Sequence, residues 1–114
     1  MIKVVYNACF GGFGVSEKAI RRMAELGHKG AKKALKKPYS FGGKKRYSLT
    51  DIDRHDPLLV QVVEELGDEA SDSLARLRIA TVDGDRYSIS YYDGRETVQG
   101  SDYDPGGWIV VEND

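Results

Sequence analysis

One cysteine and two histidines are the residues of this chain best suited to nucleophilic chemistry. Cys9 follows a strand-like apolar run, and only His28 or His55 could activate its thiol. A lone cysteine is usually a small buried apolar residue, and this set lacks the spacing of a zinc site. The sequence therefore predicts no catalytic residue, no metal and no cofactor, and it favours a protein that is not an enzyme.

A guanidinium, an imidazole and a carboxylate stand together in the run Arg54-His55-Asp56-Pro57. Asp56 is expected to cap a helix, because aspartate accepts from free amide groups and proline fits the first helical position. Arg54 has two interpretations. It pairs with an acid of the chain, or it binds a phosphate or carboxylate through two parallel hydrogen bonds.

Three glutamates could supply a carboxylate pair for acid–base chemistry. Glu64 and Glu65 lie on a predicted helix, and Glu96 follows a predicted hairpin. Nothing in their spacing brings them together, so solvated surface charge is the default interpretation.

A glycine loop lies between the strand-like run Ile2–Tyr6 and a predicted helix. Strand, glycine loop and helix in this order often present backbone amides to a phosphate. The loop lacks the lysine and Ser/Thr of a phosphate loop, and Glu17 in the first helical turn disfavours an anion. Two interpretations stay open: a structural tight turn, or one wall of a ligand pocket. The predicted ligand-binding residues are Asn7, Phe10, Gly11, Gly12 and Arg54.

The positive charge of the chain is concentrated in its first part. Residues 1–46 carry twelve Lys/Arg and two Asp/Glu, whereas residues 47–114 carry five and sixteen. Such a distribution can attract a polyanion or join two subunits head to tail. Residues 28–47 are predicted to form a mobile basic insertion, in which aromatic rings among cations suit a nucleic acid or a protein partner. The contact residues would be Lys32, Lys33, Lys36, Lys37, Lys44, Lys45 and Arg46.

Periodicity and turn residues predict the secondary structure. Helices are expected at 17–26 and 57–66, with a short cationic helical turn near 31–37. Strands are expected at 2–6, 77–82, 87–92, 96–99 and 108–111. We therefore predict one small α+β domain over residues 1–114, in the order β-α-α-β-β-β, with a mostly antiparallel sheet and two helices on one face.

Length and composition indicate an ordinary globular chain. It has 114 residues, of which 40% are hydrophobic and 31% charged, which suits one hydrophobic core. No charged-then-apolar leader or long apolar run opens it, so a cytoplasmic location away from membranes is expected. Self-association is also expected, because aromatic side chains favour interfaces. The residues concerned are Tyr87, Tyr91, Tyr92, Tyr103 and Trp108.

Three blocks of the sequence resemble a family of short proteins encoded by bacteriophages and prophages. The blocks are KVVYNACFGGFG (Lys3–Gly14), RHDPLLVQVVEELG (Arg54–Gly67) and YDGRE (Tyr92–Glu96). They are specific as a set, and His28–Tyr47 departs from the pattern. The resemblance implies a phage accessory protein in the host cytoplasm rather than a housekeeping enzyme.

Small phage proteins often act by stoichiometric binding, and this suggests two functions for the chain. The first is binding of an anionic, nucleotide-like ligand at the glycine loop, with sequestration of a bacterial defence signal as the purpose. Asn7 would bond a base or ribose, Phe10 would stack, and the glycine amides with Arg54 would hold phosphate. The alternative is an inhibitor or modulator that binds a host protein or nucleic acid through residues 29–46.

Overall fold

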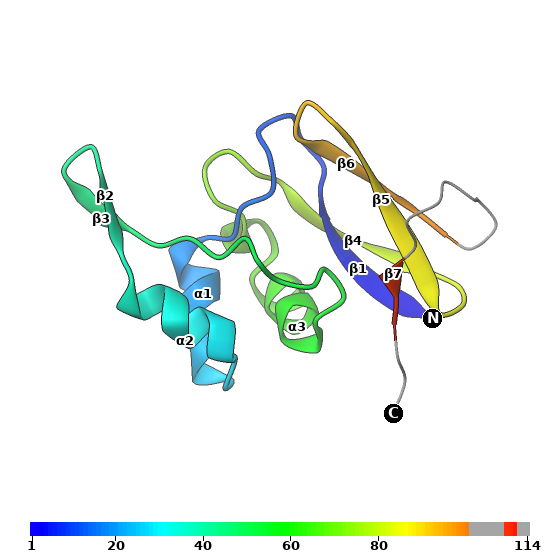
Figure 1. The fold of residues 1–114 in the computed structure, drawn as a ribbon, viewed down its shortest axis with the longest axis horizontal. Helices are drawn as coiled ribbons and strands as arrows, with labels where there is room; N and C mark the ends of the chain where they lie inside the picture. The colour runs from blue at the N-terminus through cyan, green and yellow to red at the C-terminus, as the bar shows by residue number, and fades with distance from the viewer. Residues whose placement is uncertain (101–108, 112–114) are drawn as a thin grey trace.

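The computed structural model describes residues 1–100 and 109–111, which form a small α+β domain (Figure 1). Its elements in chain order are β1 (Ile2–Asn7), α1 (Glu17–Glu25), α2 (Lys29–Lys36), β2 (Tyr39–Phe41), β3 (Lys44–Arg46), α3 (Pro57–Leu66), the 3₁₀ turn η1 (Gly67–Ala70), β4 (Leu77–Val82), β5 (Arg86–Tyr92), β6 (Arg95–Gln99) and β7 (Ile109–Val110). All strand pairs among the described residues are antiparallel. The predicted fold class is confirmed.

The strands form three small sheets in the described part of the chain. β1 pairs with β4 along its whole length, β2 pairs with β3, and β5 lies between β6 and β7. The β5–β6 turn has positive φ angles of 50° at Asp93 and 88° at Gly94, as a two-residue hairpin turn requires. β7 pairs with β5 of the same chain, whereas Trp108, predicted to begin this edge strand, lies outside the described residues.

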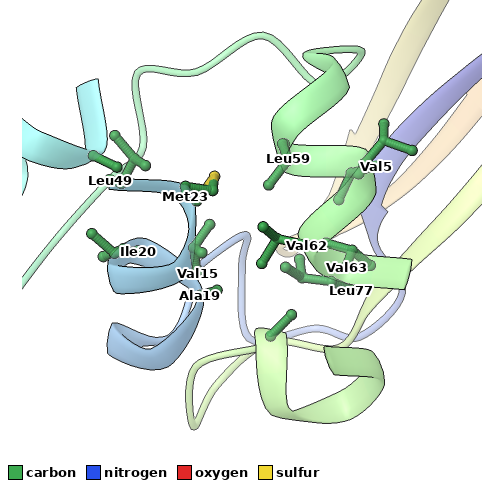
Figure 2. Packing of buried hydrophobic residues seen from close by; sticks show 13 residues of the cluster. Val5, Val15, Ala19, Ile20, Met23, Leu49, Leu59, Val62, Val63 and Leu77 are labelled. Atoms are coloured by element: carbon green, nitrogen blue, oxygen red, sulfur yellow. The ribbon is translucent and has the colours of Figure 1, made fainter. Parts of the chain in front are cut away.

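The main core lies between the helices and one face of the β1–β4 ribbon (Figure 2). In α1 the buried residues Ala19, Ile20 and Met23 recur at helical spacing, and α3 turns Leu59 and Val62 towards them. Both helices begin at side-chain caps, which are Ser16 for α1 and Asp56 for α3. The predicted helices at 17–26 and 57–66 are therefore found within one residue of their expected bounds.

A second, smaller core lies on the other face of β1. Side chains alternate between the faces of a strand, so Ile2 and Val4 pack against Tyr87 of β5 while Val5 joins the main core. β1 is thus covered on both faces, and it connects the helical part of the molecule to the β6-β5-β7 sheet.

Residues 29–46, here named the basic arm, contain α2 and the β2–β3 hairpin. Figure 1 shows the hairpin extending from α2 away from the other sheets. α2 is held by Ala31, which is fully buried, and by Ala34 and Leu35 packed against the main core. The sequence predicted a loop after the short helical turn. The structure instead has a hairpin there, because Gly42 and Gly43 both take positive φ angles and close a two-residue turn. The mobility of this segment stays a prediction.

Within the described residues, no helix has the length and apolar character needed to cross a membrane.

Candidate functional site

Three loops lie side by side at the end of the β1–β4 ribbon, and we name them the three-loop platform. They are residues 10–14 of the glycine loop, residues 72–74 before β4, and residues 91–95 around the β5–β6 turn. Cys9 at the edge of the glycine loop donates its thiol hydrogen to the Leu74 carbonyl oxygen, 3.2 Å away. Asn7 Nδ2 donates to the Gly94 carbonyl oxygen at 2.7 Å. The ends of β1, β4 and β5 therefore position the three loops together.

Glycines permit the close approach of these loops. A Cβ atom added to Gly11 would lie 1.7 Å from the Leu74 carbonyl oxygen, and one added to Gly94 would lie 2.6 Å from the Gly12 nitrogen. Any side chain at these two positions would force the loops apart. Gly12 itself has a φ angle of 97°, which side-chain-bearing residues rarely adopt. The glycine loop thus has the structural role that the sequence left open, and it also shapes a surface.

A shallow hollow of about 370 Å³ opens on this platform, and we name it the platform hollow. Phe10, Gly11 and Gly12 line it from one side, and Tyr91 lines it from β5. The rings of Phe10 and Tyr91 are 61% and 70% exposed, which is unusual for two aromatic residues in one hollow. Arg95 places its guanidinium carbon 5.7 Å from the centre of the Phe10 ring. The hollow offers two aromatic residues and the Asp93 carboxylate, with the Arg95 cation beside the Phe10 ring but outside the lining.

Asn7, a predicted ligand contact, is fully buried and has no hydrogen-bonding group left for a ligand. Its Nδ2 donates to the carbonyl oxygens of Cys9 and Gly94, at 2.8 and 2.7 Å. Its Oδ1 accepts from the Arg76 backbone amide at 2.8 Å, and the Cys9 sulfur, whose hydrogen is directed to Leu74, lies 3.4 Å away. Both donor hydrogens of the asparagine amide are therefore used, and its oxygen accepts within the protein as well. Asn7 stabilises the platform because its side chain links Cys9, Gly94 and Arg76.

Arg54, the other predicted anchor for a phosphate, makes a two-pronged ion pair with Glu96. The Nη1–Oε1 and Nη2–Oε2 distances are 2.5 and 2.9 Å, and the Glu96 side chain is only 6% exposed. Glu96 Oε1 also accepts from the backbone N–H of Asn7 at 2.8 Å. The Arg54 guanidinium carbon lies 3.6 Å from the centre of the Phe13 ring. We call Arg54, Glu96 and Asn7 the buried polar cluster. The acid that Arg54 pairs with lies 42 residues away in the sequence.

The rest of the Arg54–Pro57 run joins elements of the fold. Asp56 Oδ1 accepts from the Leu58 amide at 2.9 Å, which caps α3, and Asp56 Oδ2 lies 3.1 Å from His28 Nε2. His28 Nδ1 accepts from the Ala31 amide and caps α2, so Nε2 carries the hydrogen and donates to Asp56. His55 Nδ1 lies 2.8 Å from the hydroxyl of Tyr87. Neither histidine hydrogen-bonds the Cys9 thiol.

Burial changes the chemistry of Tyr87 at this junction. The loss of hydration raises the pKa of Tyr87 to about 12, the negative charge of Asp53 raises it further, and Arg54 opposes the shift. The phenol therefore keeps its proton to higher pH than an exposed tyrosine does.

The three glutamates suggested for acid–base chemistry do not converge. Glu64 pairs with Lys3 at 2.8 Å, Glu65 pairs with Arg22 at 3.0 Å, and Glu96 belongs to the buried polar cluster. The Arg22 guanidinium and the Gln61 amide lower the pKa of Glu65, which therefore stays ionised at neutral pH. Among the described residues, no group of three or more His, Cys, Asp or Glu side chains is arranged to hold a metal ion.

The basic arm differs from the rest of the surface in its unpaired charge. All eight of its Lys and Arg side chains are exposed. Within the described part of the chain, none of its seven lysines forms an ion pair. By contrast, seven of the nine Lys and Arg side chains outside the arm are ion-paired with described carboxylates. These are Lys3, Lys18, Arg21, Arg22, Arg54, Arg78 and Arg86.

A second hollow, of about 530 Å³, separates the β2–β3 hairpin from the start of α1, and we name it the arm hollow. Tyr39, Lys44 and Lys45 line it from the hairpin, and Leu74 lines it from the three-loop platform. Leu74 is 68% exposed and touches Gly11 through its backbone. The arm hollow and the platform hollow therefore border the same loop.

The predicted ligand-binding residues divide into two groups in space. Phe10, Gly11 and Gly12 line the platform hollow, while Asn7 and Arg54 lie beneath it in internal hydrogen bonds. Tyr91 and Arg95 also belong to this surface, and the sequence prediction did not include them. The signal was present: Tyr91 precedes the predicted Tyr92-Asp93-Gly94-Arg95 turn and Arg95 ends it, and side chains at a hairpin turn are exposed.

Comparison of the chain with models of protein families, with curated proteins and with solved structures found no match.

Proposed function

We propose that this chain is a non-catalytic binding protein that contacts the phosphate backbone of a nucleic acid through the basic arm. The proposal rests on a difference in ion pairing between the arm lysines and the cations elsewhere in the chain. The seven arm lysines have no described carboxylate partner, although the chain contains 18 Asp and Glu residues. Cations that a fold leaves unpaired on one projecting element are available to phosphates, and each contact releases counterions from the polyanion.

Two further features support a phosphate backbone as the partner. The arm contains no acid between residues 29 and 46, so nothing within it repels an anion. Tyr39 is 48% exposed on the hairpin beside Lys44 and Lys45, and a ring among cations can stack on a base. The resemblance to short phage proteins favours stoichiometric binding. Interference with a host nucleic-acid transaction would be the biological purpose.

The experiment is a salt titration of oligonucleotide binding, followed by fluorescence anisotropy. Replacement of Lys32, Lys33, Lys36 and Lys37 by alanine should reduce the slope of log K against log salt by about 3. The matched control replaces four cations outside the arm, Lys3, Lys18, Arg21 and Arg86, and should leave the slope unchanged. Equal slopes for the two quadruple variants, or binding by the wild type that ignores salt, would overturn the proposal.

A nucleotide-like ligand at the glycine loop is the second candidate function, and the platform hollow favours it. Three of the five predicted ligand contacts, Phe10, Gly11 and Gly12, line that hollow. Arg95 replaces Arg54 as the cation closest to the Phe10 ring, because Arg54 is bound to Glu96. A thermal shift induced by mononucleotides should then disappear in Phe10→Ala and Arg95→Ala. A shift that survives both substitutions rules this candidate out.

A further inference from the structure

We propose, on the basis that the arm binds a nucleic-acid backbone, that the bound strand is single-stranded and that its bases stack on the three-loop platform. The phosphates follow the basic arm, and unpaired bases lie against the rings of Phe10 and Tyr91. The proposal presupposes the proposed function and adds the class of nucleic acid to it.

The aromatic rings are the first observation that points to unpaired bases. Phe10 and Tyr91 come from loops far apart in the sequence, yet both line the platform hollow and both are mostly exposed. Every base has a π face, so exposed rings bind single strands without a required sequence. In a duplex the bases are stacked on one another, and their faces are not available to a protein ring.

The distribution of cations outside the arm is the second, independent observation. Among the described residues outside the arm, only two cations, Arg76 and Arg95, have no carboxylate partner. Arg95 places its guanidinium at the platform, whereas Arg76 is attached there by its backbone. Arg95 lies over the Phe10 ring, and the Arg76 amide hydrogen-bonds Asn7 beneath the loops. A guanidinium beside an exposed ring can bind a phosphate while the ring stacks on the neighbouring base.

The arm and the platform form one continuous surface. The arm hollow reaches from Lys44 and Lys45 to Leu74, and Leu74 touches Gly11 at the edge of the platform hollow. Figure 1 shows the hairpin, the loop before β4, the glycine loop and the β5–β6 turn in this order along one edge of the molecule. A strand laid along this edge would meet cations first and aromatic rings afterwards.

The acids on this path favour base contacts over phosphate contacts at the hollows. Glu17 and Asp72 line the arm hollow, and Asp93 lines the platform hollow. Glu17 is paired with Arg21 at 2.9 Å, and Asp72 accepts from the Leu74 amide at 2.9 Å. A carboxylate repels phosphate but accepts hydrogen bonds from the amino groups of bases. The bases should therefore face the hollows, with the phosphates directed to the arm and to Arg95.

The test compares single-stranded DNA, single-stranded RNA and duplex DNA of one sequence, each roughly 12 nucleotides long to span a typical single-strand site. We expect the wild type to prefer a single strand. Replacement of both Phe10 and Tyr91 by alanine should weaken single-strand binding roughly 30-fold or more, with an unchanged salt slope. Duplex binding should be unaffected. Tyr92→Ala is the matched control, because Tyr92 is 74% exposed next to Tyr91 but does not line the hollow.

The outcomes separate this proposal from the proposed function. Loss of binding in the lysine variant together with full single-strand binding in the aromatic variant overturns the stacking platform and keeps the arm. No effect of the lysine variant overturns the proposed function itself. Equal affinity of the wild type for duplex and single strand overturns the single-strand assignment. If the alanine variant unfolds, Phe10→Leu with Tyr91→Leu preserves apolar contact but removes the π faces, and it should lose single-strand binding equally.

Discussion

In the buried polar cluster the charged groups are paired inside the protein, whereas the lysines of the basic arm are exposed to solvent. In the cluster, the guanidinium of Arg54 and the carboxylate of Glu96 face each other under the platform, and Asn7 adds a further hydrogen bond to the carboxylate. In the arm, the lysines of α2 and the β2–β3 hairpin face solvent without a described carboxylate partner. Polar groups whose capacity is satisfied internally specify the structure, whereas groups left unsatisfied at the surface are available for binding.

The lysines of the basic arm, rather than the residues of the buried polar cluster, are therefore the ones to test first for function. Arg54 and Asn7 have the side chains that a nucleotide site requires, but each is occupied by the protein itself. Each arm lysine offers only an ammonium group, but that group is exposed to solvent. Substitutions in the cluster should therefore change stability first, and substitutions in the arm should change binding first.

The largest expected effect is the loss of stability on Glu96→Ala. The substitution leaves the Arg54 guanidinium largely buried without its partner, which typically costs about 3–5 kcal/mol. Urea denaturation would measure the change, with arm binding of the folded fraction unaltered. Arg54→Ala should cost a similar amount. A stability cost below about 1 kcal/mol for Arg54→Ala, together with loss of a nucleotide-induced thermal shift, would instead indicate that Arg54 contacts the ligand.

The second effect is the dependence of stability on pH at Tyr87. Its pKa is raised from 10.0 to about 12 by burial, so the folded phenol keeps its proton while the unfolded one ionises. The stabilisation is complete below pH 10 and falls as the pH rises from 10 to 12, by about 2–3 kcal/mol in total. The free energy of unfolding should fall less steeply over this range in Tyr87→Phe. Identical pH profiles for the two proteins would contradict the assigned cause.

The third effect concerns His28, which connects the basic arm to the start of α3. His28→Ala removes the cap of α2 and the bond to Asp56, which should cost about 1–2 kcal/mol. Because α2 carries four of the seven arm lysines, oligonucleotide binding should weaken as well. Ser71→Ala, which removes the hydrogen bond that Ser71 Oγ accepts from the Leu77 amide at 2.8 Å, is the control for a lost side-chain-to-backbone bond outside the arm. If both variants weaken binding equally, the order of α2 is not what supports the arm.

The smallest effect on stability is expected for Lys44→Ala combined with Lys45→Ala. Both side chains are exposed on β3 and have no described ion pair, so the free energy of unfolding should change by about 0.5 kcal/mol or less. The slope of log K against log salt for single-strand binding should nevertheless fall by about 1.4. Thermal unfolding and anisotropy on the same samples would show whether stability and binding separate. A large loss of stability here would remove the contrast with the buried polar cluster.

The elements with strong local signals could be predicted from the sequence. α3 has an aspartate cap, a proline at its first position and a glycine stop, and it was placed at its observed bounds of 57–66. β4 alternates polar and apolar residues and was also placed at 77–82. The β2–β3 hairpin was missed because its lysines suggested a loop. The Gly42-Gly43 pair, which closes the hairpin, was a turn signal that the composition obscured.

The site was less predictable, because its geometry depends on contacts between distant residues. The sequence identified Arg54 and Glu96 separately. They are 42 residues apart, and no spacing rule predicts that Arg54 Nη1 lies 2.5 Å from Glu96 Oε1. The same holds for Gly11, whose contact with Leu74 comes from the pairing of β1 with β4. The sequence did predict Phe10 as a stacking residue, a role that stays a prediction, and it did not place Tyr91 beside it in the same hollow.

The double burial of β1 has a consequence for how the chain folds. Ile2 pairs with Val82 and Asn7 with Leu77, so this apolar strand has no partner until the chain through β4 has been made. The helices can form from local contacts much earlier, whereas the pairing of β1 requires closure of a long loop. During synthesis Ile2–Tyr6 is therefore an exposed strand edge, and folding intermediates that expose it would be prone to aggregate.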